Sequence, residues 1–125
     1  MKIAVIFVRT AMGLLFLFGS ITYLFNLMPQ PELQGNVKVF MDGVMATGYL
    51  MTLIKVTELV CGIAFVTGRF VALASVVIAP VIINIFFFHT LVEPSGMAIG
   101  VFLVLANSFV AYANWDKYQP LLRAK

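Results

Sequence analysis

Four long apolar segments, separated by short polar connections, dominate the chain. They cover about residues 3–27, 43–67, 70–88 and 94–113. Each is long enough to cross about 30 Å of hydrocarbon as a helix that rises about 1.5 Å per residue. These segments lack the period-two alternation of membrane strands, and backbone in lipid must bond within helices or closed barrels. The pattern predicts an all-α integral membrane four-helix bundle, one domain over residues 1–125.

The connections predict how the helices follow one another. The connection Thr67–Arg69 is so short that the second and third helices must form an antiparallel hairpin. Gly68 suits the left-handed conformation that ends a helix, and Pro94 suits the first turn of the fourth helix. In the longest connection, we expect a short interfacial helix that starts after Asn36 as N-cap and covers the mouth of the bundle. Its apolar residues fall on one helical stripe: Val37, Phe40, Met41 and Val44.

The overall composition also indicates a membrane protein. The chain has 125 residues, of which 62% are hydrophobic and 10% charged, and its mean hydropathy is +1.06. Soluble domains are about half apolar and about a quarter charged. The first segment resembles a signal peptide, but Arg9 interrupts it and apolar residues continue to Leu27 without a small-residue cleavage site. We therefore interpret it as the first span, with the lipid bilayer as partner.

The basic residues are few, and their distribution predicts an orientation. The net charge is +3, without the cluster of Lys and Arg that binding to nucleic acid requires. If both termini are cytoplasmic, Lys38 lies on the opposite side from the other basic residues of the connections and ends. Those residues are Lys2, Arg9, Arg69, Lys117, Arg123 and Lys125. The expected location is the bacterial cytoplasmic (inner) membrane, multi-pass, with both termini in the cytoplasm.

Two opposite charges in the second span carry the main functional hypothesis. Lys55 and Glu58 are three residues apart, on one face of a helix. A charged residue at the centre of a span costs roughly 2.5–3.5 kcal/mol, so this face should point into the bundle. Measured from Gly68 at about 1.5 Å per residue, Arg9 and Asn107 lie near the depth of Glu58. We expect Arg9, Glu58 and Asn107 to form one polar tier.

A second tier is expected on the outer side, from Lys55 and Asn84. His89 points about 140° away from Asn84 on an ideal helix, so one pocket holds both only if the third helix bends or His89 reaches sideways. An intramembrane ionisable residue suggests a functional site, although an ion-pair network that only fixes helix register remains the alternative. The candidate ligand-binding residues are Arg9, Lys55, Glu58, Asn84, His89 and Asn107.

Other motifs add little chemistry. Cys61 and His89 are each the single residue of their type, so the sequence suggests no disulfide and no metal site. Gly96 and Gly100 form a GxxxG motif in the fourth span. Such motifs let helices approach closely, either within one bundle or in a homo-oligomer.

Taken together, these residues resemble the DoxX family of small bacterial membrane proteins. The resemblance lies in VRTAMGLLFLFGS, residues 45–70, APVIINIFFFHTLVEPSG and the basic tail WDKYQPLLRAK. It implies a four-helix membrane bundle with the family's Arg9, Glu58, Asn84 and His89 positions filled. It also implies a connection to redox stress and to membrane subunits of thiosulfate:quinone oxidoreductase. Many members carry a lysine near the end of the first helix, where this chain has Thr22 and Tyr23, and Lys55 could supply that charge.

Three functions follow as expectations. The first is a membrane component of a redox or quinone-linked system with a polar pocket inside the membrane. The chain has no flavin, haem, iron–sulfur or dinucleotide motif, so electrons would come from a redox partner protein or a bound quinone. The second is a small permease or proton conduit, and the third is a structural subunit without ligand. No motif identifies a reaction, so the sequence leaves open whether the protein is an enzyme.

Overall fold

The computed structural model describes residues 2–27 and 34–123. Within these ranges the chain forms helices and turns, without strands, which confirms the all-α prediction. The α-helices are α1 (Lys2–Leu24), α2 (Gly35–Ala46), α3 (Leu50–Thr67), α4 (Val71–Phe87), α5 (Met97–Ala113) and α6 (Trp115–Tyr118). A π-helical turn η1 (Phe88–Val92) and the 3₁₀ turns η2 (Pro94–Gly96) and η3 (Gln119–Leu122) complete the elements.

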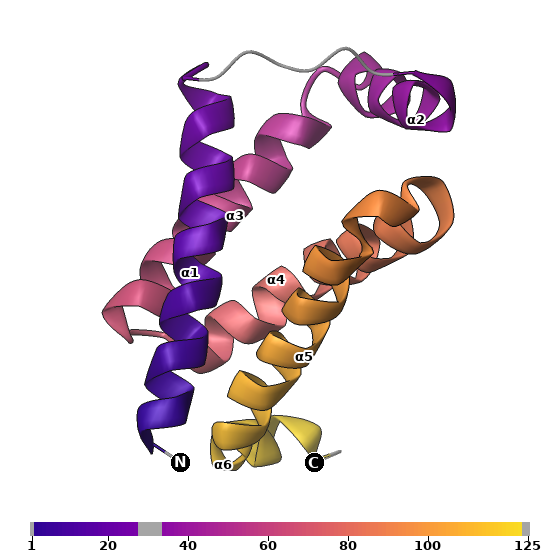
Figure 1. Ribbon diagram of the computed structural model, residues 1–125. Coiled ribbons are helices and arrows are strands. Elements are labelled where there is room, and N and C mark those ends of the chain that lie inside the picture. The colour runs from indigo at the N-terminus through magenta and orange to yellow at the C-terminus, as the bar shows by residue number, and fades with distance from the viewer. Residues whose placement is uncertain (1, 28–33, 124–125) are drawn as a thin grey trace.

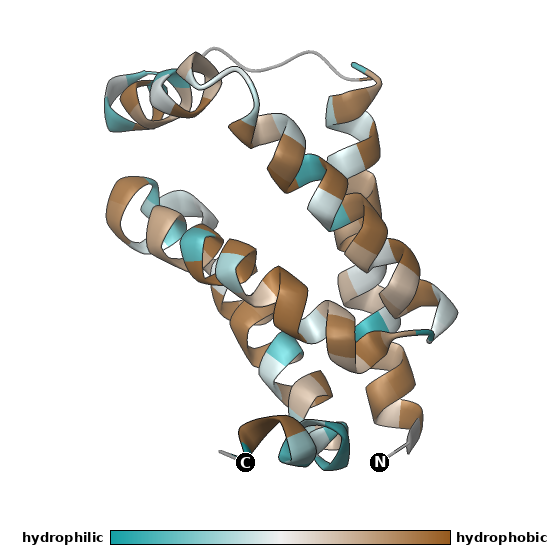
Figure 2. Ribbon diagram, turned by 180° about the vertical axis from the view of Figure 1, so that it is seen from behind, coloured by the Kyte–Doolittle hydropathy of each residue, from teal (hydrophilic) through white to brown (hydrophobic). Residues whose placement is uncertain are grey.

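Four helical segments of the described chain are long and apolar enough to cross a membrane. They are Ile3–Leu24, Leu50–Thr67, Val71–Val92 and Pro94–Ala113. Figure 1 shows both ends of the chain at one end of the bundle and α2 at the other. Hydrophobic residues predominate along the spans, which carry isolated hydrophilic positions, and hydrophilic residues are also present on α6 and α2 (Figure 2). This arrangement is that of an integral membrane four-helix bundle, as predicted.

The core lies where the four spanning helices meet. Its fully or almost fully buried side chains include Met12 and Phe16 of α1, Phe65 of α3, Ile78 of α4 and Val110 of α5. Many large apolar side chains point outward instead, among them Phe7, Phe18, Leu73 and Leu105. In a soluble protein this much exposed apolar surface would be a liability, whereas in a bilayer it is the surface that contacts acyl chains.

The closest helix contact joins α1 and α3 at a pair of glycines. A Cβ built on Gly13 would lie 2.9 Å from the carbonyl oxygen of Gly62 and 2.8 Å from Val66 Cγ2. A Cβ on Gly62 would lie 3.0 Å from the carbonyl oxygen of Gly13. Small residues at a crossing let two membrane helices approach until their backbones touch. Gly13 and Gly62 therefore fix how α1 and α3 pack.

The hairpin between α3 and α4 has the expected geometry. Gly68 ends α3 in the left-handed conformation, with φ 78°, and its N–H donates to the Ala64 carbonyl at 2.9 Å. Phe70 precedes α4 and is also left-handed, with φ 56°, a conformation that is uncommon for residues with a side chain. Two left-handed residues around Arg69 reverse the chain within three positions.

Several predicted boundaries were wrong. The first helix ends at Leu24 rather than Leu27, because Asn26 adopts a positive φ of 53°. The second spanning helix begins at Leu50, not at residue 43, because Gly48 turns the chain with φ 77°. Each turn residue breaks a helix that its apolar neighbours would otherwise have continued.

The short helix between the first two spans exists, but its start also differs from the prediction. α2 begins at Gly35, and its N-cap position is Gln34 rather than Asn36. The expected stripe is partly realised, because Val44 is buried and Met41 is half-buried. On the exposed face of α2, Lys38 pairs with Asp42 at 2.8 Å, and this hydrogen bond raises the pKa of the Lys38 ammonium group.

We predict that Gly13→Ala destabilises the protein by about 1–3 kcal/mol, the usual cost of overpacking a tight contact. The added methyl group would force α1 away from α3. The matched control is Gly43→Ala on α2, where a Cβ meets nothing within 4 Å. Dodecyl sulfate titration in mild detergent measures the free energy of unfolding. Equal stability of the two variants would contradict a backbone contact at Gly13.

Candidate functional site

A pocket of about 600 Å³ lies between α1 and α3 on one side and α4 and α5 on the other. α2 lies across one end of it, contributing Phe40, Met41 and Val44. Most of its lining is aliphatic or aromatic. The polar side chains that line it are Lys55 and Glu58 from α3, Asn84 from α4 and His89 from η1. The pocket therefore has an apolar body with polar groups from two opposing helical segments.

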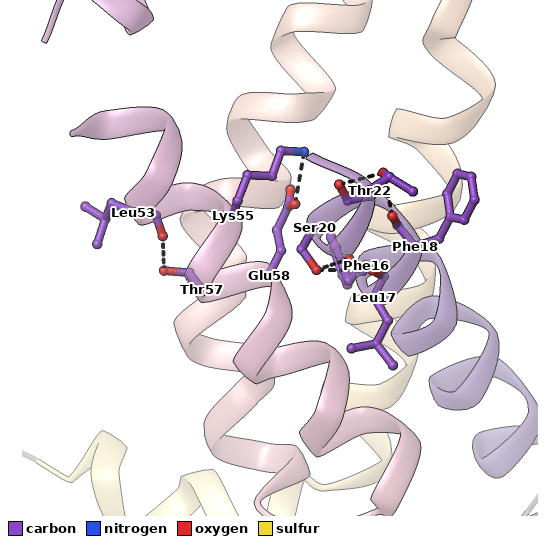
Figure 3. Close-up of polar contacts among 10 residues, drawn as sticks. Phe16, Leu17, Phe18, Ser20, Thr22, Leu53, Lys55, Thr57 and Glu58 are labelled. Carbon is purple, nitrogen blue, oxygen red and sulfur yellow. Dashed lines mark hydrogen bonds and ion pairs between the residues drawn. The ribbon is translucent and has the colours of Figure 1, made fainter. Parts of the chain in front are cut away.

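Lys55 and Glu58 form an ion pair on the α3 wall. Lys55 Nζ lies 3.2 Å from Glu58 Oε2, and the two side chains point toward one another beside α1 (Figure 3). The Glu58 side chain is 7% exposed and that of Lys55 21%. The ammonium group also lies 5.7 Å from the centroid of the Tyr23 ring, within reach of a cation–π interaction. On the side of α1, protein therefore covers this ion pair and separates it from the surroundings of the spans.

Sequence reasoning missed the part that α1 plays around this pair. Gly19 lies beside the lysine head, since a Cβ built there would meet Lys55 Nζ at an ordinary contact distance of 4.0 Å. Tyr23 follows Gly19 by four residues and so lies on the same face of α1. No sequence pattern in α1 signalled these contacts in advance.

His89 and Asn84 line the opposite wall of the same pocket. Both residues therefore line one pocket although an ideal helix separates them by about 140°. The helix passes into the π-turn η1 here, where the Glu93 N–H donates to the Phe88 carbonyl at 2.8 Å. His89 Nδ1 is buried and has no hydrogen-bond partner among the described residues.

The GxxxG motif of the fourth span receives His89. A Cβ on Gly96 would collide with the imidazole ring, and a Cβ on Gly100 would lie 3.6 Å from His89 Cβ and 3.3 Å from Phe86 Cα. The two glycines thus accommodate a side chain and backbone from the same chain. Contacts within one chain therefore explain the GxxxG motif. A homo-oligomer stays a prediction, and this motif does not support it.

Arg9 and Asn107 do not join the pocket, so the predicted tier of Arg9, Glu58 and Asn107 was wrong. Arg9 Nη1 donates to the carbonyl of Phe65 at 2.5 Å and to that of Val66 at 3.4 Å. Asn107 Nδ2 donates to the Ser75 carbonyl at 3.1 Å. The last carbonyls of a helix lack partners within it and carry partial negative charge. Arg9 therefore satisfies this end of α3 and does not line the pocket.

The pocket opens toward the surroundings of the spans. Several lining residues are exposed although they belong to spanning helices: Leu15 and Phe18 on α1, Asn84 on α4 and Ile99 on α5. At the α2 end, Phe40 and Phe88 close the space with ring centroids 4.9 Å apart. These exposed lining residues all belong to segments long and apolar enough to span a membrane, so the opening lies at the level of the spans.

The chemistry available is that of hydrogen bonding and proton exchange. Lys55 supplies an ammonium donor, Glu58 a carboxyl group, and Asn84 and His89 an amide and an imidazole. In the described part of the chain, no group of three or more His, Cys, Asp or Glu residues could hold a metal ion. Cys61 is buried and does not line the pocket.

Comparison with known proteins identifies a family. The family model described as DoxX matches residues 4–91, more than half of the 125-residue chain. The matched range contains Arg9 and the four polar residues of the pocket, whereas Asn107 lies outside it. Searches of curated proteins and of solved structures found no match.

We predict that Arg9→Met lowers the free energy of unfolding by about 1–3 kcal/mol, because buried carbonyls of Phe65 and Val66 lose their donor. The control is Lys117→Met, which removes an exposed cation from α6. Detergent unfolding titrations of both variants test this. An Arg9→Met protein as stable as the control would show that the α3 end does not need the guanidinium group.

We also predict non-additive effects at the ion pair. Glu58→Gln and Lys55→Met should each cost about 1–3 kcal/mol, because each leaves the other charge without its partner. The double variant should be more stable than the sum of the single effects implies, by about 1 kcal/mol or more. A double-mutant cycle on unfolding free energies measures this coupling, and strict additivity would contradict the pair.

Proposed function

This chain belongs to the DoxX family, and on that premise we propose that it is a membrane component of a quinone-linked redox system. It binds a quinone-type molecule in the pocket between the α1–α3 and α4–α5 pairs. The observation that carries the proposal is the pocket itself: about 600 Å³ of mostly apolar space with four polar side chains on two opposing walls. Small-molecule sites have this size and this combination of apolar lining with few polar groups.

A quinone fits the distribution of polar groups. Its ring is flat and apolar and carries two carbonyl oxygens on opposite edges, each of which accepts hydrogen bonds. Lys55 can donate from the α3 wall, and Asn84 or His89 from the opposite wall. The apolar tail of such a molecule would leave through the lipid-facing opening at Leu15, Phe18 and Ile99.

Glu58 supplies the proton chemistry in this proposal. Reduction of a quinone to a quinol adds two electrons and two protons, one proton to each carbonyl oxygen. The electrons would come from a redox partner protein, since the chain carries no motif for a redox cofactor of its own. The ion pair would supply both protons: the Lys55 ammonium gives one to a carbonyl oxygen, and the Glu58 carboxylate, 3.2 Å away, takes up a proton from water and passes it to the other.

The proposed location is the bacterial cytoplasmic membrane, with both termini in the cytoplasm. Two observations support this orientation. The two chain ends lie at one end of the bundle (Figure 1), together with Arg9, which bonds to the end of α3. Lys38 lies on α2 at the opposite end. The excess of basic residues at the termini matches the positive-inside rule.

A proton conduit is the weaker alternative. It would need polar side chains that continue from Glu58 toward the end with the termini. The two residues expected there, Arg9 and Asn107, donate to backbone carbonyls instead. The side chains of Met12 and Phe65 beside Arg9 are completely buried and apolar. The pocket is better suited to hold a molecule than to pass protons across the membrane.

The test is quinone binding by the purified protein. We expect quinone in organic extracts of protein purified in mild detergent, and saturable binding of an added short-chain ubiquinone or menaquinone analogue. Ile54→Trp should fill the pocket and weaken binding about tenfold or more, equivalent to about 1.4 kcal/mol. His89→Leu and Asn84→Leu should each weaken it about fivefold through loss of one hydrogen bond.

The matched control is Val56→Trp, two residues from Ile54 on the same helix. Val56 is 43% exposed and does not line the pocket, so this variant should bind quinone as the unmodified protein does. Absence of quinone from the extracts together with no binding of either analogue would refute the proposal. So would equal loss of binding in both tryptophan variants, because the effect would then not depend on the pocket.

A further inference from the structure

A second hollow lies on the α3–α4 hairpin, away from the pocket described above. It measures about 560 Å³, and its lining comes from the second half of α3, the turn at Arg69 and the first half of α4. It shares no lining residue with the quinone pocket. Apart from Arg69 and the hydroxyl of Thr67, its lining is apolar. We refer to it as the hairpin groove.

The side chains of the hairpin groove give it a trough shape. Its floor is made of small side chains, including Cys61 at 2% and Ala74 at 5% exposure. Its rims are large aliphatic side chains that project outward, such as Val60 and Leu73, each 60% exposed. Both helices belong to membrane spans, so the trough faces acyl chains along its length. An apolar hollow of about 560 Å³ between two spanning helices suits part of one hydrocarbon chain.

One cation stands at the end of the trough. Arg69 is exposed and follows the last residue of the α3 span, Thr67, which places it at the level of lipid headgroups. The ion pairs of the described residues are Lys38–Asp42 and Lys55–Glu58, and neither includes Arg69. Residues 59–92 contain no Asp or Glu. Among the described residues, the one carboxylate of α3 and α4, Glu58, is paired with Lys55, so neither helix neutralises the guanidinium group.

We propose that the hairpin groove binds one anionic phospholipid. One acyl chain lies in the trough between Val60 and Leu73, and the phosphate group accepts hydrogen bonds from the Arg69 guanidinium. Arginine matches phosphate in geometry as well as charge, because its planar group donates two parallel hydrogen bonds. Basic residues between spanning helices at the cytoplasmic surface are a recurrent form of lipid headgroup site.

The experiment compares two lipids that differ only in the headgroup. The protein is mixed in mild detergent with equal amounts of dioleoyl phosphatidylglycerol and dioleoyl phosphatidylcholine, and native mass spectrometry measures which lipid is retained. One basic residue near the surface contributes enough to favour the anionic lipid about fivefold. Arg69→Gln should reduce this preference to nearly one. Lys117→Gln, which removes an exposed cation on α6, should leave it unchanged.

A second variant tests the trough rather than the charge. Ala64→Leu places a larger side chain in the groove. It should lower the retention of both lipids while its unfolding midpoint stays close to that of the unmodified protein. The proposal is overturned if the protein retains both lipids equally, if Arg69→Gln keeps the preference, or if a dimer forms that excludes lipid from the groove. Since none of these variants lies at the quinone pocket, failure here leaves quinone binding unaffected.

Discussion

The packing of α1 against α3 sets the positions of most polar side chains in this protein. The two helices run antiparallel and touch at Gly13 and Gly62, where a methyl group on either would meet the opposite backbone. Toward the chain termini from this crossing, α1 delivers Arg9 to the last carbonyls of α3. In the other direction, Gly19 and Tyr23 receive the ammonium group of Lys55. One contact between two glycines thus fixes both ends of the interface.

The membrane explains why polar residues of the spans have such different roles. A carbonyl without a partner is costly in lipid, and no water is present to replace the missing donor. Arg9 meets that requirement at the end of α3, where it donates to the carbonyls of Phe65 and Val66. Lys55 and Glu58 satisfy each other and still line a pocket. Polar residues at similar depth therefore have different contacts. Arg9 donates to backbone carbonyls, whereas Lys55 and Glu58 line the pocket.

The sequence was sufficient for the spans, the hairpin at Gly68 and the inward face of α3, because each depends on local periodicity or on a single turn residue. It was insufficient for Arg9, because a charge of suitable depth can pair with a carboxylate or with a carbonyl, and only the packing of α1 decides. It was also insufficient for His89, because ideal helix periodicity places it away from Asn84, whereas in the fold both residues line one pocket. Whether the pocket binds a quinone stays a prediction.

The contact between Phe40 and Phe88 has a consequence for molecules that enter the pocket. These rings lie at its end beneath α2, while its exposed lining residues belong to the spanning segments. For the proposed ligand, the effective concentration would then be a mole fraction in lipid rather than a molarity in water. Such a pocket would favour apolar compounds, which partition into the bilayer, over hydrophilic compounds of similar shape.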